Sequence, residues 1–301
     1  MPEVLAEETF ESHRRHLTGL AYRMLGSAAE AEDAVQETYL RWAAAGRGMG
    51  IAAPRAYLTK IVSRICLDQL KAARRRRETY VGPWLPEPIV TTAAPGPAAG
   101  DVGELAHDLS VGLMLMLERL SPLERAAFLL HDVFDMEWAG VAEALSSTPE
   151  ACRQLATRAR RHVRSGAPRF HPSSDDGRAL IAAFALAARS GDVAGLTSRL
   201  AEDAVVISDG GGRRQAARKP IRGADRVARF FIGLARKYGA RLERQFRFEH
   251  QMVNDLPGFL VFGPDGLERT VAVDISPDGR IRAIYMVLNP EKLRGTRAQL
   301  S

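Results

Sequence analysis

Cysteine is scarce in this sequence, with only Cys66 and Cys152 among 301 residues. Neither lies at metal-site spacing from a second cysteine or a histidine, so we predict no metal site and two buried, apolar thiols. The longest strongly apolar run, Leu113 to Leu117, is far shorter than the roughly 20 residues of a membrane-spanning helix, and the N-terminus lacks a signal-peptide pattern. The sequence therefore predicts a cytoplasmic protein with no membrane contact and no bound cofactor.

Basic residues do not dominate the first half of the chain, although the net charge is +6 and the pI is about 9.6. Residues 1–166 carry 20 basic and 21 acidic side chains, whereas residues 167–301 carry 22 and 15. Between Arg41 and Arg77 there are ten basic residues and one acid, and between Met1 and Leu40 there are eight acids. This local segregation of charge predicts two different partners more clearly than the overall basicity predicts nucleic-acid binding.

The length of the chain exceeds the usual span of one domain. Apolar residues at three- and four-residue spacing predict helices over Phe10–Leu25, Ala28–Trp42 and Pro54–Arg77, and helices resume near Glu104. Two intervening stretches are rich in proline and glycine, which is typical of linkers. We therefore expect a helical unit, a linker, a second helical unit, a short linker and a C-terminal domain, at residues 1–77, 78–103, 104–166, 167–176 and 177–301.

The C-terminal domain shows mixed helix and strand patterns, which predict an α+β fold. Ser276 to Arg280 form a turn signal between two alternating runs, so a hairpin is expected there. The predicted helices are Arg178–Ser190, Val193–Leu200 and Ile221–Tyr238, and the predicted strands are Ala204–Ser208, Leu256–Phe262, Thr270–Ile275 and Ile281–Leu288.

Residues 137–163 carry the pattern of a helix-turn-helix. A short helix with one apolar stripe ends at Leu145, Ser146 to Thr148 supply a turn and an N-cap, and Pro149 takes the first position of the next helix. The outward face of this second helix predicts base contacts near its N-terminus and phosphate contacts farther along. The predicted base-contacting residues are Glu150, Arg153 and Gln154, and the predicted phosphate-contacting residues are Arg158, Arg160 and Arg161. An arginine-rich helix face that is simply solvated remains the alternative.

The order of these segments resembles that of the extracytoplasmic-function RNA polymerase sigma factors. Residues Ala28 to Trp42 are similar to that family's polymerase-binding helix, and the resemblance implies that Asp33, Gln36 and Glu37 face the clamp of the largest polymerase subunit. Promoter DNA is the second partner implied. A sigma factor that acts with polymerase needs only a monomer, and the family is not enzymatic.

Residues Pro54 to Arg77 are similar to the helix that opens and reads the minus-ten element, with a base-capturing loop at about Ala44 to Ala53. Its apolar residues are expected to point inward. The residues left to meet DNA are Arg55, Lys60, Ser63, Arg64 and Lys71, with the basic run Arg74, Arg75, Arg76 and Arg77. The helix-turn-helix is then the reader of the minus-thirty-five element.

Three further motifs resemble signatures of the sigma-factor subgroup that carries a SnoaL-like C-terminal domain, a curved sheet wrapped by helices. The resemblance implies regulation in cis, and we expect the linker motif to lie against the glycine run, where glycines allow close backbone approach. The residues of these motifs are Trp84, Leu85 and Pro86 in the linker, Asp209, Gly210, Gly211, Gly212 and Arg213, and Asn289, Pro290, Lys292 and Leu293.

Relatives of the SnoaL-like fold include cyclases and isomerases, so Asp209, His250, Asp274 and Tyr285 are candidates for acid–base chemistry. No partner is visible by spacing for these residues, and we predict no catalytic residue. A small-molecule ligand of the C-terminal domain is a further expected partner. Two alternatives remain open: a SnoaL-like enzyme fused to a DNA-binding module, and a dimeric repressor, which the separate basic helix at 54–77 argues against.

Overall fold

The computed structural model describes residues 2–45, 51–77, 80–91, 111–164 and 174–299. They fold into two compact units. The first combines Met1–Thr79 with Gly112–Ala167, and the second combines Tyr80–Val111 with Pro168–Ser301. The residues of the first linker that the structure describes thus belong to the C-terminal unit.

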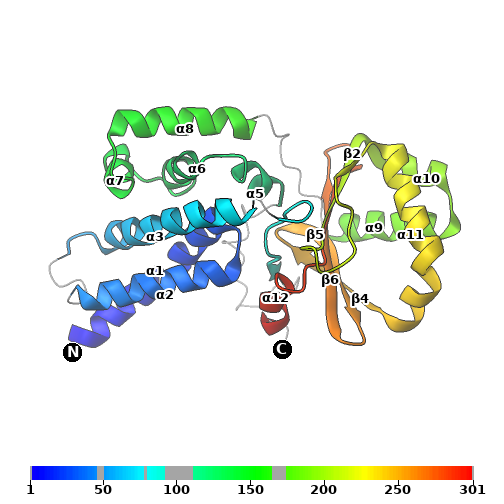
Figure 1. Cartoon of the computed structure of the whole chain (residues 1–301), viewed down its shortest axis with the longest axis horizontal. Helices are drawn as coiled ribbons and strands as arrows, with labels where there is room; N and C mark the ends of the chain where they lie inside the picture. Colours follow the sequence, from blue (N-terminus) through cyan, green and yellow to red (C-terminus); the bar gives the residue numbers. More distant parts are fainter. Residues whose placement is uncertain (1, 46–50, 78–79, 92–110, 165–173, 300–301) are drawn as a thin grey trace. The chain divides into compact units, whose positions relative to one another are not determined.

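The first unit is helical throughout its described residues (Figure 1). The first three helices pack together through buried side chains such as Phe10, Trp42 and Leu58. Ser27 caps the second helix by accepting a hydrogen bond from the Glu30 backbone. The helices are α1 (Pro2–Leu25), α2 (Ala28–Ala44), α3 (Pro54–Arg77), α5 (Val111–Leu117), α6 (Pro122–Phe128), the π-helical turn η1 (Leu129–Val133), α7 (Trp138–Ala144) and α8 (Pro149–Arg164).

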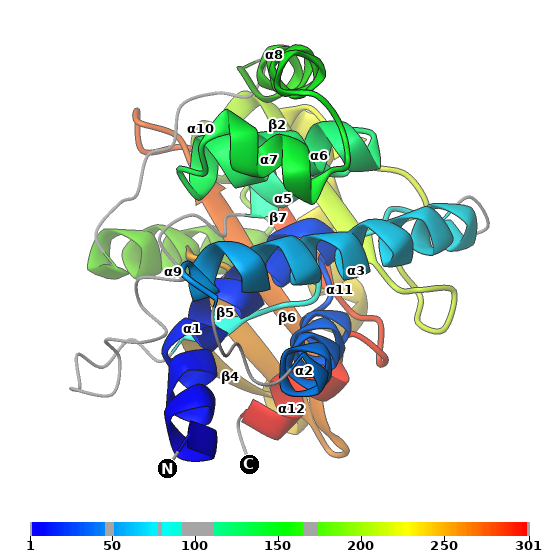
Figure 2. The same cartoon turned by 90° about the vertical axis from the view of Figure 1, so that its left-hand side faces the viewer.

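The helices before and after the linker form one packed body. Arg125 of α6 is only 2% exposed, and its Nε donates to the backbone oxygen of Arg23 in α1 at 2.9 Å. The same guanidinium forms an ion pair with Glu118. Helix α7 lies alongside α3, as Figures 1 and 2 both show. Helix α3 is therefore covered from two sides.

The second unit is built on a seven-stranded sheet in the order β1-β4-β5-β6-β7-β2-β3. Strands β2 and β7 are parallel, and the other neighbours are antiparallel. Register shifts in β2/β7, β5/β6 and β6/β7 are the kind of irregularity that bends a sheet. The strands are β1 (Val90–Thr91), β2 (Leu200–Asp209), β3 (Ile221–Arg222), β4 (Arg247–Val253), β5 (Leu256–Gly263), β6 (Gly266–Ile275) and β7 (Ile281–Val287).

Three helices, α9 (Ser174–Ser190), α10 (Val193–Ser198) and α11 (Ala224–Gln245), lie on one side of this sheet (Figure 1). The main core of the unit fills the space between them and the sheet, with Phe184 from α9 and Ile284 from β7 among its buried side chains. Helix α12 (Leu293–Gln299) follows the last strand. This α+β architecture is the one expected from the sequence.

Several local expectations need correction. Ile221 and Arg222 form strand β3 instead of the first turn of a helix, because Gly223 has a φ of +92° and α11 begins only at Ala224. The predicted helix at Val193–Leu200 ends at Ser198, and β2 starts at Leu200. Strands β1 and β4 were not predicted. All residues of β4 except Val253 are exposed or half-buried, so its sequence carries little apolar alternation.

Both cysteines are buried, as predicted. Among the described residues, no group of side chains is arranged to hold a metal ion. No helix in the described ranges is long and apolar enough to cross a membrane.

Gly258 provides a test of the sheet. A Cβ at this position would lie 2.0 Å from the backbone oxygen of Val271 on β6, so Gly258→Ala should lower the unfolding free energy of the C-terminal unit by more than ~2 kcal/mol. A Cβ at Gly239 in α11 meets nothing within 4 Å, so Gly239→Ala should stabilise the unit by ~0.5–1 kcal/mol. Urea unfolding measures both, and equal effects of the two substitutions would contradict this register.

Candidate functional site

The acidic helix α2 presents one open face. Asp33 and Gln36 are exposed, while Glu37 is partly exposed and accepts a hydrogen bond from Arg41 at 2.8 Å. Leu40 lies at helical spacing from these residues and is 56% exposed. Leu40 was not predicted, because a leucine in an amphipathic helix is expected to point inward. A single exposed leucine is common on protein surfaces, so Leu40 adds an apolar contact point to this acidic face but does not by itself mark an interface.

The basic residues of α3 do not all lie free. Lys60 forms an ion pair with Glu143 of α7 at 2.5 Å, and this hydrogen bond lowers the pKa of the Glu143 carboxyl below its usual value. Arg64 donates to the Glu143 backbone oxygen at 3.1 Å and to the Ser146 hydroxyl at 3.0 Å. Lys60 and Arg64, which were predicted to contact DNA, therefore bind the helix-turn-helix of the same unit in this structure.

The expectation that Ser63 points outward is wrong. Its side chain is fully buried and donates to the backbone oxygen of Thr59 at 2.6 Å. The buried surface of α3 is wider than a single stripe because helices pack on two sides of it. Arg55 and Lys71 are exposed as expected. The side chains of Arg74, Arg75, Arg76 and Arg77, and the loop residues 46–50, lie outside the described part of the structure.

The helix-turn-helix comprises α7, α8 and the turn between them. Ser146 adopts a φ of +52° in this turn, and Thr148 caps α8 by accepting from the Ala151 backbone at 3.2 Å. Most of the predicted outward face is exposed, namely Glu150, Arg153, Gln154, Arg158 and Arg161. Arg160 differs, since it is only partly exposed, forms an ion pair with Asp132 at 2.8 Å and lies 6.0 Å from the ring centre of Trp138. These contacts hold α8 against η1 and α7.

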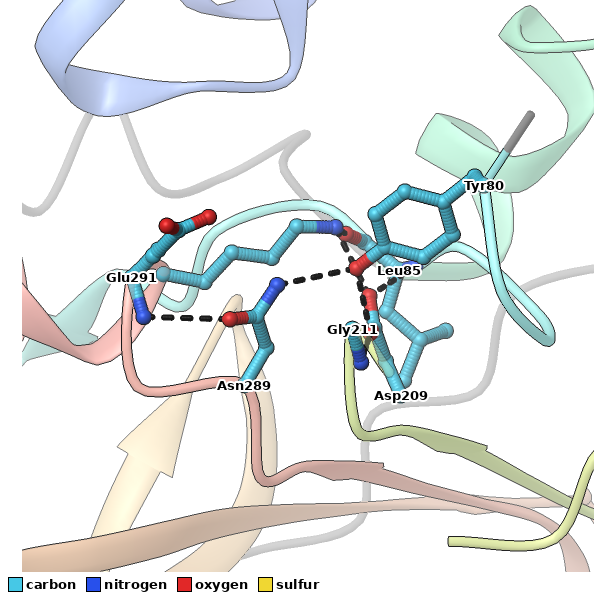
Figure 3. Close-up of polar contacts among 7 residues, drawn as sticks. Tyr80, Leu85, Asp209, Gly211, Asn289 and Glu291 are labelled. Atoms are coloured by element: carbon cyan, nitrogen blue, oxygen red, sulfur yellow. Dashed lines mark hydrogen bonds and ion pairs between the residues drawn. The ribbon is translucent and has the colours of Figure 1, made fainter. Parts of the chain in front are cut away.

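The second candidate site joins the linker to the C-terminal sheet around Asp209 (Figure 3). This carboxylate, at the end of β2, is completely buried. It accepts hydrogen bonds from the Tyr80 hydroxyl at 2.5 Å, the Leu85 backbone at 2.9 Å and the Gly211 backbone at 3.0 Å. It also forms an ion pair with Lys292 at 2.7 Å. Residues from three distant parts of the sequence thus meet at one buried charge.

Lys292 is buried on the linker side of this pair. Its ammonium nitrogen lies 5.0 Å from the ring centre of Tyr80 and 4.2 Å from that of Trp84, and it donates to the Leu85 backbone oxygen. Burial, together with the hydrogen bond to Asp209, raises the pKa of the Tyr80 hydroxyl above its usual value. The phenol therefore stays protonated and serves Asp209 as a donor.

The glycine run makes this close approach feasible. Gly211 and Gly212 have backbone φ values of +59° and +71°, which residues other than glycine rarely adopt. A Cβ at Gly211 would lie 2.3 Å from the Asn289 amide nitrogen, and one at Gly212 would lie 3.2 Å from Val81 of the linker. A Cβ at Gly210 would lie 2.2 Å from the Arg214 backbone oxygen. Each glycine of the run is required by this geometry.

The third motif closes the site from the C-terminal side. Asn289 donates to the Tyr80 hydroxyl at 2.9 Å and accepts from the Glu291 backbone at 3.0 Å, while Arg213 pairs with Glu291 at 2.6 Å. Leu293 is buried, and Pro290 is partly buried beside it in the chain. The structure thus brings together all three motifs that the sequence singled out.

The linker is held further along its length by residues that sequence analysis missed. Thr296 of α12 donates to the Pro88 backbone oxygen at 2.9 Å, and Asn254 accepts from the Ile89 backbone at 3.3 Å. Val90 and Thr91 then pair with β4. No pattern in the sequence marks these residues or Tyr80, because their neighbours in space are far away in the chain.

The four candidates for acid–base chemistry are not gathered in one place. Asp209 is committed to the linker, and His250 is exposed on β4. Asp274 pairs with Arg282 at 2.7 Å. Burial raises the pKa of Tyr285, which shares a sheet face with Asp274. None of the four lines the cavity of about 780 Å³ that the C-terminal unit contains.

Family comparison assigns both helical segments. The model described as Sigma-70 region 2 matches residues 9–76, and that described as Sigma-70, region 4 matches residues 110–163.

Two curated proteins of Mycobacterium tuberculosis match nearly the whole chain. The ECF RNA polymerase sigma factor SigJ (strain ATCC 25618 / H37Rv) is 39% identical over 296 residues, covering 95% of this chain and 93% of its own. The probable ECF RNA polymerase sigma factor SigI (strain CDC 1551 / Oshkosh) is 32% identical over 300 residues, covering 97% and 96%.

The crystal structure of Mycobacterium tuberculosis SigJ superimposes with a TM-score of 0.76 at 36% identity, covering 95% of this chain and 97% of that one. The match includes the C-terminal unit, whose mixed, curved sheet is the SnoaL-like fold that the motifs implied.

The buried pair of Asp209 and Lys292 is tested by a double-mutant cycle. Asp209→Asn leaves a buried ammonium without its carboxylate and should cost about 3–5 kcal/mol of unfolding free energy. Because the two residues share one interaction, Asp209→Asn combined with Lys292→Met should cost at least ~1 kcal/mol less than the sum of the single changes.

Urea unfolding of the four proteins gives these values, with exposed Asp203→Asn as the control that should leave the midpoint unchanged. Additive effects of the two single substitutions would show that the pair does not act as a unit.

Proposed function

Because this chain belongs to the extracytoplasmic-function RNA polymerase sigma factors, we propose that its C-terminal unit regulates the sigma factor in cis by holding the linker between its two DNA-reading regions. As a sigma factor, the chain binds core RNA polymerase and directs promoter recognition and transcription initiation. Members of this family are initiation factors and not enzymes. The observation that carries the proposal is the burial of Asp209 against Leu85 and Lys292.

We assign the polymerase contact to the exposed face of α2. Asp33, Gln36 and Glu37, with Leu40, suit a basic and partly apolar surface, for which the clamp of the largest polymerase subunit is the proposed partner. The described basic side chains of α3 are assigned to the minus-ten element. The N-terminal part of α8 is assigned to base edges of the minus-thirty-five element, and Arg158 and Arg161 to phosphates.

We infer that the contact between α3 and α7 belongs to a conformation of the first unit that is not bound to promoter DNA. Two promoter elements about 25 base pairs apart are separated by roughly 80 Å of B-form DNA. Helices that touch through Lys60 and Glu143 do not reach both elements, so the two regions must separate on the promoter. Lys60 and Arg64 then exchange their contacts with α7 for contacts with DNA.

The linker sets how far the two regions can separate. Fully extended, the chain between Arg77 and Val111 reaches roughly 110 Å, and holding residues 80–89 on the C-terminal unit removes roughly 35 Å of that reach. We propose two sigma regions at residues 1–77 and 104–166, joined by the linker 78–103. A second linker at 167–176 leads to the C-terminal domain at 177–301. We infer that the bound linker restrains the sigma factor, which acts as a monomer, and that a small-molecule ligand of the C-terminal unit adjusts the restraint.

The polymerase contact is tested by Asp33→Arg. Reversing this exposed charge opposes a basic partner surface, so the affinity for core polymerase should fall at least tenfold in a fluorescence-polarisation titration with the full chain. Glu202→Arg makes the same charge change at an exposed position of the C-terminal unit and should bind as the unmodified chain does. Equal affinities of all three proteins would remove α2 from the interface.

The restraint is tested by Trp84→Ala, which removes the ring over Lys292 and leaves the buried pair in place. In transcription with core polymerase and a promoter library, this variant should give at least twofold more transcript than the unmodified chain, because the linker is released more readily. Trp84→Phe keeps an aromatic face and should stay close to the unmodified chain. An unchanged or lower yield from Trp84→Ala would contradict restraint by the linker.

A further inference from the structure

The cavity of about 780 Å³ lies between α11 and one end of the sheet, beyond the apolar core of the C-terminal unit. Its size is within the range of small-molecule sites. Apolar side chains make up much of its wall, including Phe230 and Leu234 of α11, Phe246, and Met286 and Leu288 at the end of β7. Such a wall suits the body of an organic molecule and not a bare inorganic ion.

Charged groups in the cavity are mostly basic. Arg269 on β6 carries a buried Nε that has no hydrogen-bond partner among the described residues. Burial also lowers the pKa of its guanidinium. A buried donor left without an acceptor is destabilising, so an acceptor supplied from outside the chain would be favourable. This arrangement points to an anionic group as the missing partner.

Two other residues define where that group sits. Arg214, on the loop after the glycine run, is exposed and pairs with the largely buried Glu268 at 3.2 Å. Arg229 of α11 also lines the cavity but is already paired with Asp225 at 2.8 Å. Lys237 of α11 also lines the cavity and is exposed. Arg269 is the group with an unpartnered buried donor, and the charge of Arg214 lies near enough to lower its pKa, so an anion is expected at these two residues, where it would compete with Glu268.

We propose that this cavity binds an amphipathic organic anion, a carboxylate or sulfonate on an aromatic or otherwise apolar body, with its acidic group at Arg269 and Arg214. The inference rests on the proposed function, because it names the chemical class of the ligand that adjusts the linker restraint. The apolar body lies against Phe230, Phe246 and Met286.

The cavity shares a wall with the linker site. Adjacent residues of β2 point to opposite faces of the sheet, so Ser208 lines the cavity while Asp209 holds the linker. The Ser208 hydroxyl accepts from the Ala217 backbone at 2.9 Å and thereby fixes the loop that carries Arg214. Residues 214–217 also line a second cavity of about 440 Å³ that Val81 and Gly82 of the linker border. A ligand that displaces Arg214 thus acts on the loop that contacts the linker.

The proposal is tested with two dyes of nearly the same shape, the anion 8-anilinonaphthalene-1-sulfonate and its neutral counterpart N-phenyl-1-naphthylamine. Fluorescence titration of the full chain should show saturable binding of both. Arg269→Met keeps the volume and removes the charge, so it should weaken binding of the sulfonate at least tenfold and binding of the neutral dye less than twofold. Arg280→Met, in the exposed turn between β6 and β7, should change neither.

A second variant tests the location. A Cβ at Gly233 of α11 meets nothing within 4 Å, so Gly233→Leu places a bulky side chain at the cavity without a backbone clash and should weaken binding of both dyes at least tenfold. Absence of dye binding to the unmodified chain, equal losses of both dyes with Arg269→Met, or full binding to Gly233→Leu would overturn the proposal. Arg214→Met replaces Arg269→Met if the latter does not fold. Transcription by Trp84→Ala is measured without dye, so the linker proposal fails or survives independently.

Discussion

The carboxylate of Asp209 has no contact with water, and a positive charge must therefore lie beside it. Lys292 supplies that charge at 2.7 Å, and the linker covers both groups with Tyr80, Trp84 and the Leu85 backbone. Removing the linker would expose an ion pair whose geometry is complete only when the linker is bound. The position of the linker and the folding of the C-terminal unit are consequently coupled through one buried interaction.

The proposed regulation has a short structural route. The end of β2 carries Ser208 on the cavity side and Asp209 on the linker side, so the proposed ligand and the linker contact neighbouring residues of one strand. The glycine run that follows Asp209 has the backbone freedom to shift. In the first unit, the contacts of Lys60 and Arg64 with α7 are exposed or partly exposed and polar, and such contacts exchange readily for contacts with phosphate.

Much of the fold follows from the sequence because amphipathic helices have a strong period. Helices α2, α3, α7 and α8 lie within a few residues of their predicted bounds. Strand β4 and the two-residue strand β1 were not predicted, since β1 is very short and only Val253 of β4 is fully buried, which leaves little apolar alternation. Ser63 was misplaced because a period reveals one buried stripe, and α3 is covered on two sides. Motif resemblance named Asp209 and Lys292, whereas Tyr80 and Thr296 acquire their contacts only from the folded chain.

Hydrogen exchange at the Leu85 amide tests the central claim most directly, because this amide donates to the buried Asp209 carboxylate in the middle of the linker. In the free full-length chain, the account predicts that Leu85 exchanges far more slowly than an unprotected peptide amide, since its amide opens only when the linker leaves the buried pair. Asp209→Asn should accelerate Leu85 while leaving the amides of α2 unchanged. Exchange of Leu85 at the rate of an unprotected peptide in the unmodified chain would contradict the account.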